Sequence, residues 1–251
     1  MSNWKILIVM ASLGCGTLQM SAQQTIAPAH HAATVAKQPI EGVAALAPGE
    51  SIPNLDTLKD EIRQYHSCTC KCGCYAKDLD LQSDRAIAFL RRRATHMRAG
   101  EKLAVVLDID ETSLSNWQEM EAAGFAYDSK AFNAWVESAR APAIPGTVRI
   151  VQEAQRLGVN VVFLTGRSES QRAATEQNLR AAGYARWYRL ILRSPAQAHQ
   201  TALAYKSAER AKLVADGYRI ILNVGDQWSD LRGQTPAEYS VKYPDPFYFL
   251  K

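Results

Sequence analysis

Four short, largely apolar runs are separated by segments of helical periodicity. Of all the features of the sequence, this pattern most strongly limits the possible fold classes. Runs of this length and composition are typical of strands buried in a parallel sheet. Strands that alternate with helices predict an α/β fold, here a Rossmann-like parallel sheet with helices on both faces. The runs cover 103–107, 159–164, 189–192 and 219–224, and helices are predicted over 146–157, 169–182 and 204–216.

The segment that precedes this core is predicted to be partly helical. Apolar residues recur at helical spacing over 54–66 and again over 75–97. Residues 23–53 are instead rich in Ala, Pro and Gln and have no sustained apolar period, which is typical of a linker or flexible arm. We therefore divide the chain into an N-terminal segment 1–22, an arm 23–53, a helical region 54–100 and a core 101–251.

Residues 1–22 have the pattern of a secretory signal peptide. Lys5 supplies the positive start, the apolar run after it is too short to span a bilayer, and cleavage is predicted after Ala22. A second interpretation compares 12–15 with a bacterial lipobox, in which Cys15 would carry lipid. Both interpretations predict an exported protein: periplasmic, an outer-membrane lipoprotein, or secreted. Membrane contact is expected only if Cys15 is lipidated.

The charge balance argues against a nucleic acid polymer as the partner. The 251 residues carry 29 basic and 25 acidic side chains, a formal net charge of +4, which is mild for a nucleic-acid-binding domain. No P-loop, GxSxG or HExxH pattern occurs, so NTPase, serine hydrolase and zinc protease functions have no support. The sequence leaves open whether the chain forms a homo-oligomer.

Reactive side chains follow three of the predicted strands, at the point where each strand ends. Asp108 and Asp110 follow the first run, Thr165 the second and Asp226 the fourth, while Lys206 lies in the helix after the third. Because the carboxyl ends of parallel strands meet at one edge, we expect these side chains to converge on a cleft. Carboxylates suit Mg²⁺, a carboxylate beside the metal can attack phosphorus, and hydroxyl or ammonium groups can hold phosphoryl oxygens. The sequence therefore predicts a site for phosphoryl transfer.

Four segments resemble the four motifs of the haloacid dehalogenase superfamily of phosphatases, in order and in spacing. They are 108–112 (Asp-Ile-Asp-Glu-Thr), 163–167 (Phe-Leu-Thr-Gly-Arg), Lys206 and 225–230 (Gly-Asp-Gln-Trp-Ser-Asp). The longer phrases 105–116 and 225–231 look like the secreted acid phosphatases of subfamily III, which include bacterial class B and class C enzymes and plant vegetative storage proteins. The resemblance covers residues 54–251. The short stretch between the first two motifs implies that the fold has no large cap domain.

The resemblance implies a role for each residue of the predicted cleft. Asp108 resembles the nucleophile and a Mg²⁺ ligand, and Asp110 resembles the general acid and base, with its backbone carbonyl on the metal. Thr165 resembles the phosphate-binding hydroxyl. Lys206 resembles the cation that holds the nucleophile and the phosphoryl group together, and Asp226 resembles the acidic metal ligand.

Five further residues are candidates for supporting roles. Asp230 resembles a second acidic residue of the metal loop, which would bind the metal or pair with the motif lysine. Gly166 and Arg167 belong to the phosphate-binding motif, and Arg167 is expected to bind substrate or to pair with a nearby acid. Trp117 and Trp135 are candidates to flank a ring of the substrate.

The resemblance as a whole implies an exported, Mg²⁺-dependent acid phosphatase. It would hydrolyse small phosphomonoesters, nucleoside monophosphates among them, through an aspartyl-phosphate intermediate. One alternative is a non-catalytic storage or surface-binding protein on the same fold, which loss of the nucleophile would mark; this chain keeps Asp108. The other alternative is a phosphotransferase.

A dense cluster of cysteines precedes the core. Disulfides are plausible because an exported protein meets oxidising conditions, thiolates at this density can also bind Zn²⁺ or Cu⁺, and free or intermolecular thiols remain a third alternative. The cluster consists of Cys68, Cys70, Cys72 and Cys74.

Overall fold

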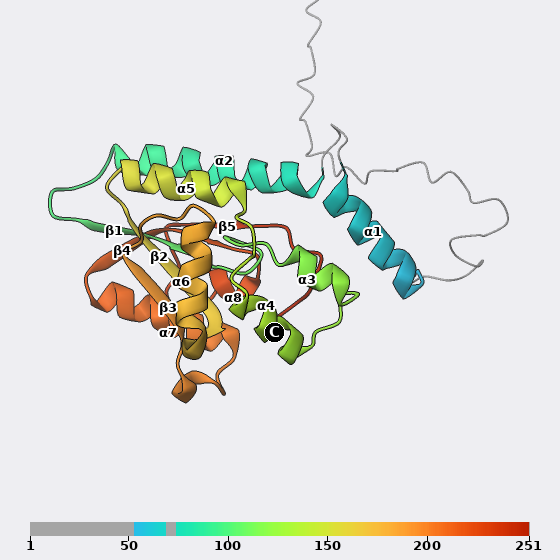
Figure 1. The fold of residues 1–251 in the computed structure, drawn as a ribbon. Coiled ribbons are helices and arrows are strands. Elements are labelled where there is room, and N and C mark those ends of the chain that lie inside the picture. The colour runs from blue at the N-terminus through green and yellow to red at the C-terminus, as the bar shows by residue number, and fades with distance from the viewer. Residues whose placement is uncertain (1–52, 69–73, 251) are drawn as a thin grey trace, which may run out of the picture. The chain divides into compact units, whose positions relative to one another are not determined.

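One five-stranded sheet, in which all strands run parallel, organises the chain. The computed structural model describes residues 53–68 and 74–250. The strands lie in the order β3-β2-β1-β4-β5 (Figure 1), which confirms the predicted α/β fold. Their bounds are β1 (Lys102–Leu107), β2 (Asn160–Ser168), β3 (Arg189–Arg193), β4 (Tyr218–Gly225) and β5 (Tyr239–Lys242).

Helices cover both faces of the sheet, because successive side chains of a strand point to opposite sides. Val105 of β1 belongs to the core layer that α2 (Tyr75–Ala94) and α5 (Pro145–Arg156) cover. Its neighbour Val106 belongs to a second layer, which α7 (Ala202–Ala215) covers. The sheet is therefore buried on both sides, as its apolar strands predict.

The other helices are shorter or lie at the edges of this sandwich. No large cap domain separates β1 from α5, because that segment contains only two short helices, α3 and α4. The remaining bounds are α1 (Leu55–Ser67), α3 (Trp117–Ala122), α4 (Ser129–Glu137), α6 (Arg172–Ala181) and α8 (Trp228–Leu231), with 3₁₀ turns at Glu169–Gln171 and Pro195–Gln197.

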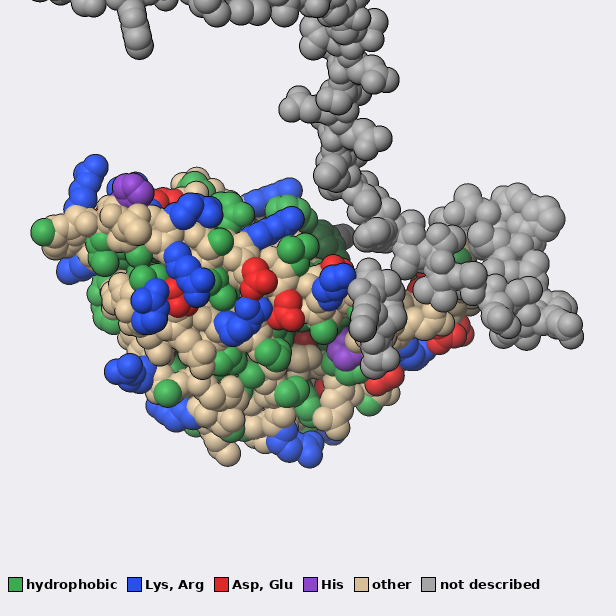
Figure 2. Space-filling view, turned by 90° about the horizontal axis from the view of Figure 1, so that it is seen from above, with side chains coloured by type: hydrophobic (Ala, Val, Ile, Leu, Met, Phe, Trp, Pro, Cys, Tyr) green, Lys and Arg blue, Asp and Glu red, His purple; other side chains and the backbone are tan. Residues whose placement is uncertain are grey.

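The outer face of α2 and α5 carries charges of both signs (Figure 2). Guanidinium nitrogens of Arg149 lie 2.9 Å and 2.6 Å from carboxylate oxygens of Asp80 and Asp84. The guanidinium of Arg91 lies 2.8 Å from a carboxylate oxygen of Glu153. Such pairs are typical of a solvated helix face, and they differ from the one-sided basic patch of a nucleic-acid-binding surface.

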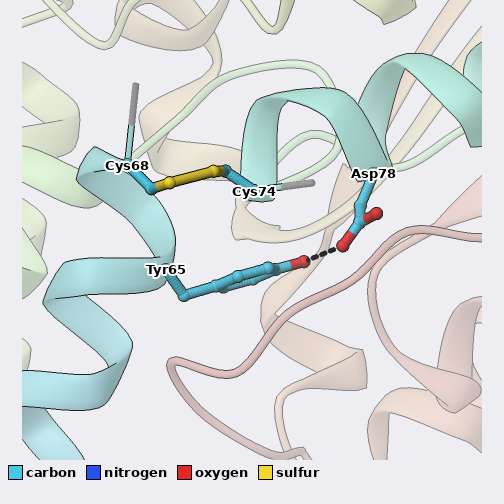
Figure 3. Close-up of a disulfide and its surroundings, with 4 residues drawn as sticks. All are labelled: Tyr65, Cys68, Cys74 and Asp78. Carbon is cyan, nitrogen blue, oxygen red and sulfur yellow. Dashed lines mark hydrogen bonds between the residues drawn. A yellow bond between two sulfur atoms is a disulfide. The ribbon is translucent and has the colours of Figure 1, made fainter. Parts of the chain in front are cut away.

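A disulfide between Cys68 and Cys74 joins the end of α1 to the start of α2 (Figure 3). Beside it, the Tyr65 hydroxyl donates a hydrogen bond of 2.7 Å to Asp78 Oδ2. No residue of α1 is fully buried, and the helix is held on the domain by these links, by ring contacts and by the packing of Ile62 against the core. Of the three alternatives for the cysteine cluster, the structure shows a disulfide for Cys68 and Cys74. The other two cysteines, Cys70 and Cys72, lie outside the described residues.

Replacing both Cys68 and Cys74 with alanine should lower the free energy of unfolding. The two cysteines are six residues apart, and closing so short a loop in the unfolded chain contributes about 2 kcal/mol. Urea denaturation, with and without a thiol reductant, measures the change. The native protein should lose a similar amount in reductant while the variant should not respond. A variant as stable as the native protein would show that the link contributes nothing.

Much of the N-terminal interpretation concerns residues outside the described part of the chain. The predicted signal peptide 1–22, with Cys15, and all but the last residue of the arm 23–53 lie there. Among the described residues, no helix combines the length and the apolar character that a bilayer crossing requires.

Candidate active site

The carboxyl ends of the central strands bring the predicted side chains to one edge of the sheet. Asp108 directly follows β1 and Asp226 directly follows β4, its neighbour in the sheet. Thr165 lies within β2, on the other side of β1, because this strand continues past the apolar run that marks its core. Lys206 reaches the same edge from α7. The topology therefore supplies the convergence that the motifs predict.

A buried ion-pair network surrounds Lys206. Its ammonium lies 2.6 Å from Asp108 Oδ1 and 2.5 Å from Asp230 Oδ1, and no more than 7% of any of these three side chains is exposed. Burial lowers the pKa of Lys206, but the two carboxylate charges outweigh burial and raise it overall. The lysine therefore stays charged and holds the two carboxylates in place.

Three carboxylates gather beside this lysine. One ligand oxygen from each of Asp108, Asp226 and Asp230 lies within 4.8 Å of the others, and all three residues are buried. Burial raises the pKa of Asp108 and of Asp226, and the neighbouring carboxylates raise both further. A single ammonium group is too little positive charge for three buried carboxylates.

This donor set fits a divalent cation. Hard oxygen ligands that leave coordination positions open are what Mg²⁺ prefers, and a cation would offset the excess negative charge. The carboxylates of three predicted metal residues are therefore together. Asp110 is the fourth predicted metal residue. Its carboxylate is not part of this group and pairs with Arg167 instead.

Asp110 and Arg167 form a second ion pair at this edge. Arg167 Nη2 lies 2.7 Å from Asp110 Oδ1, and the Arg167 side chain is 1% exposed. Burial raises the pKa of Asp110, but the Arg167 charge and hydrogen bonds from Arg167 and Asn116 outweigh it and lower the pKa overall. Of the two alternatives for Arg167, the structure therefore places it against an acid.

Thr165 and Gly166 directly precede Arg167 in β2. The Thr165 side chain is fully buried, and its Oγ1 accepts a hydrogen bond of 3.1 Å from the Arg167 backbone N–H. Gly166 is exposed. In β2 the buried Thr165 hydroxyl is therefore followed by an exposed glycine.

Both predicted tryptophans contact other side chains of the protein. Trp117 stacks on His66 of α1, with ring centroids 3.6 Å apart and planes 6° apart. Trp135 is buried in α4, and its indole N–H donates to Asn116 Oδ1 at 2.8 Å. These contacts are made with protein groups, and contact of either ring with a substrate stays a prediction.

The structure adds three residues to which the motif resemblance assigns no role. The Thr112 hydroxyl donates to Asp226 Oδ1 at 2.9 Å, and Gln227 Nε2 donates to Asp226 Oδ2 at 2.8 Å. The Tyr248 hydroxyl donates to the same Oδ2 at 3.3 Å. Thr112 and Gln227 lie inside the first and fourth motifs, and this position in the sequence could have identified them as candidate site residues. Tyr248 lies 22 residues after Asp226 and contacts it through the packing of the C-terminal segment.

A hollow of about 490 Å³ opens beside Asp226. This volume lies in the range of small-molecule sites. Its lining combines aromatic and apolar side chains with polar and charged ones. The hollow is lined by Asp226, Gln227, Trp228, Lys242, Asp245, Pro246, Tyr248 and Phe249.

Comparison with known proteins places the chain in one family. The model of the HAD superfamily, subfamily IIIB (Acid phosphatase), matches residues 29–251. Acid phosphatase 1 of Solanum lycopersicum is 34% identical over 218 residues, which cover 82% of this chain and 78% of the tomato protein. The stem 28 kDa glycoprotein of Glycine max is 35% identical over 182 residues, which cover 70% of each chain. Relatives at this level thus include both an enzyme and a stem glycoprotein.

Solved structures agree on the fold. The class C acid phosphatase from Bacillus anthracis, solved with tungstate bound, superposes with a TM-score of 0.63 at 21% identity and covers 78% of this chain and 86% of that one. The parallel sheet with helices on both faces is the fold that the resemblance implies. The chain therefore belongs to the HAD superfamily, subfamily IIIB, the acid phosphatases, and is a phosphomonoester hydrolase of that family.

Proposed function

We propose that this protein is an exported, Mg²⁺-dependent acid phosphatase that acts on small phosphomonoesters, nucleoside monophosphates among them. One observation carries the proposal. The two motif aspartates end the same strand but have different partners: Lys206 holds Asp108, and Arg167 holds Asp110. Two carboxylates in different environments can do two different tasks, which a two-step phosphoryl transfer requires.

Asp108 is the proposed nucleophile. Lys206 holds its Oδ1 at 2.6 Å, and its Oδ2 accepts no hydrogen bond from the described residues, which leaves that oxygen available for attack on phosphorus. The Asp108–phosphorus bond would form as the bond from phosphorus to the ester oxygen breaks. Thr165, the Gly166 backbone N–H and Lys206 would then hold the phosphoryl oxygens.

Asp110 is the proposed acid and base. It would give a proton to the departing alcohol and take one from the water that releases phosphate from Asp108. Because Arg167 and Asn116 lower the pKa of Asp110 against the effect of burial, its acid form is favoured only at acidic pH. This direction is consistent with an acid phosphatase.

The proposed metal site uses the residues of the carboxylate cluster. Asp108 and Asp226 would bind Mg²⁺ through their side chains, and Asp110 through its backbone carbonyl. When bound, the cation would offset negative charge on the phosphoryl group and the carboxylates. Asp230 is the proposed partner of Lys206 rather than a ligand, because Lys206 holds its Oδ1 at 2.5 Å and the Gln227 backbone N–H holds its Oδ2 at 2.8 Å.

The substrate and the location of the protein follow from less direct observations. The hollow beside Asp226 is large enough for the organic part of a small phosphomonoester. The mild net charge of +4 favours a small molecule over a nucleic acid polymer. Export, with cleavage after Ala22 or lipid on Cys15, is proposed from the pattern of residues 1–22.

Hydrolysis at mildly acidic pH tests the proposal. The purified protein should release inorganic phosphate from p-nitrophenyl phosphate and from a nucleoside monophosphate, EDTA should abolish the release, and added Mg²⁺ should restore it. Added alcohol, as a competing acceptor, would show phosphotransfer by forming a new ester. If the folded protein releases no phosphate with Mg²⁺ present, the enzymatic proposal fails in favour of the storage or binding alternative.

A further inference from the structure

Asn116 lies at the centre of a buried hydrogen-bond network that reaches the first motif. It is fully buried immediately before α3. Its side-chain Nδ2 donates to Asp110 Oδ1 at 2.9 Å and to Glu111 Oε2 at 2.8 Å, and its backbone N–H donates to Glu111 Oε1 at 2.6 Å. Its Oδ1 accepts the indole N–H of Trp135 at 2.8 Å. All polar groups of this side chain are thus engaged.

The indole N–H of Trp135 favours one orientation of the Asn116 amide. An indole N–H can only donate, so it must meet the amide oxygen, and the amide NH₂ is then turned toward the two carboxylates. The reverse orientation would put NH₂ against the indole N–H and the amide oxygen against two carboxylates. Because the groups are buried, each of those mismatches would be costly.

The two carboxylate oxygens of Asp110 accept different numbers of hydrogen bonds from this network. Oδ1 receives hydrogen bonds from Asn116 Nδ2 at 2.9 Å, from Arg167 Nη2 at 2.7 Å and from Arg167 Nε at 3.1 Å. Among the described residues, Oδ2 receives only the longer contact of 3.2 Å from Arg167 Nε. The Asp110 side chain is 17% exposed, so Oδ2 is the oxygen left for a substrate.

We propose that Trp135 is a positioning residue, which acts through Asn116 to hold Asp110 with Oδ2 toward the ester oxygen of the substrate. The inference rests on the proposed role of Asp110 as the proton donor. It gives Trp135 a task different from contact with a substrate ring. Neither Trp135 nor Asn116 touches the substrate in this arrangement.

A comparison of leaving groups tests the proposal, with the variant Trp135→Phe. Phenylalanine keeps an aromatic ring in the core but removes the N–H. An alkyl phosphate needs a proton on its departing oxygen, whereas p-nitrophenyl phosphate departs as a stable anion and needs it far less. The quantity to measure is kcat/KM, because it includes every step up to departure of the alcohol. The ratio of kcat/KM for the alkyl ester to that for the nitrophenyl ester should fall about fivefold or more.

A double-mutant cycle shows whether Trp135 acts through Asn116. Asn116→Ala alone should lower the ratio at least as far, and adding Trp135→Phe to it should lower the ratio no further, because the intermediate group is gone. Trp187→Phe, which removes an indole N–H from a partly buried ring packed on Phe163, is the matched control and should leave the ratio unchanged. Thermal unfolding of each variant confirms that it is folded.

The outcomes separate this inference from the proposed function. The positioning role would be overturned if Trp135→Phe leaves the ratio unchanged, which includes an equal fall in kcat/KM for both esters. It would also be overturned if the substitution raises KM for both esters. Independent effects of the two substitutions would also overturn it. If Asp110→Asn itself leaves the ratio unchanged, then the proton-donor role of Asp110 fails, which is a failure of the proposed function.

Discussion

Replacing Asp108 with asparagine should lower kcat/KM for any phosphomonoester by about 10⁴-fold or more, the scale of losing a nucleophile. An amide oxygen cannot form the acyl phosphate, and the substitution changes neither the volume nor the reach of the side chain. The substitution should not unfold the protein. Burial raises the pKa of Asp108, so its ionised form is costly in the fold, and Lys206 keeps Asp230 as a partner.

Phosphate release and thermal unfolding, measured on the same preparation, check this result. Asp84→Asn is the matched control, because this exposed aspartate pairs with Arg149 on the α2–α5 face, and it should keep full activity. Activity of Asp108→Asn within about tenfold of the native protein would mean that another group attacks phosphorus. That outcome would contradict the aspartyl-phosphate route but not the family.

The main strands of the fold could be predicted because burial on both faces makes them continuously apolar. Val105 and Val106 of β1 face opposite layers, and no alternating pattern interrupts the run. By contrast β5, Tyr239–Lys242, carries a serine and a lysine and pairs on one side only. An edge strand of four residues leaves too little pattern to distinguish it from a loop. The four-residue helix α8 escaped prediction for the same reason.

The sequence could predict those parts of the candidate site whose positions are determined by the carboxyl ends of the strands. Asp108, Thr165 and Asp226 lie on neighbouring strands, so their convergence follows from the topology. The partners of Arg167 and Trp135 could not be predicted, because they depend on how α4 and the segment after β1 pack. Trp135 is 19 residues from Asn116 in sequence and meets it only in the fold. An aromatic ring near a motif is therefore weak evidence for substrate contact.

Replacing Asp226 with asparagine should remove the stabilisation that Mg²⁺ gives to the folded protein. A cation at 100 times its Kd stabilises the folded state by about 2.7 kcal/mol, which corresponds to a rise in Tm of about 5–10 °C for a chain of this size. The variant loses one of two proposed side-chain ligands, so its rise should be under about 2 °C. The two proteins in EDTA give the baseline for this comparison. The substitution removes a charge that burial and the nearby Asp230 and Asp245 make costly, and it also removes an oxygen that accepts hydrogen bonds from neighbouring side chains.

The raised pKa of Asp226 also fixes how the Mg²⁺ effect should change with pH. An acid whose pKa is higher in the folded than in the unfolded state stabilises the fold below its unfolded pKa. That contribution is lost as pH rises through the folded pKa. A cation must displace the proton from such an acid, so the Mg²⁺-induced rise in Tm of the native protein should be larger at neutral than at mildly acidic pH. Asp84→Asn should behave like the native protein, whereas an undiminished rise in Asp226→Asn would place the cation on other residues.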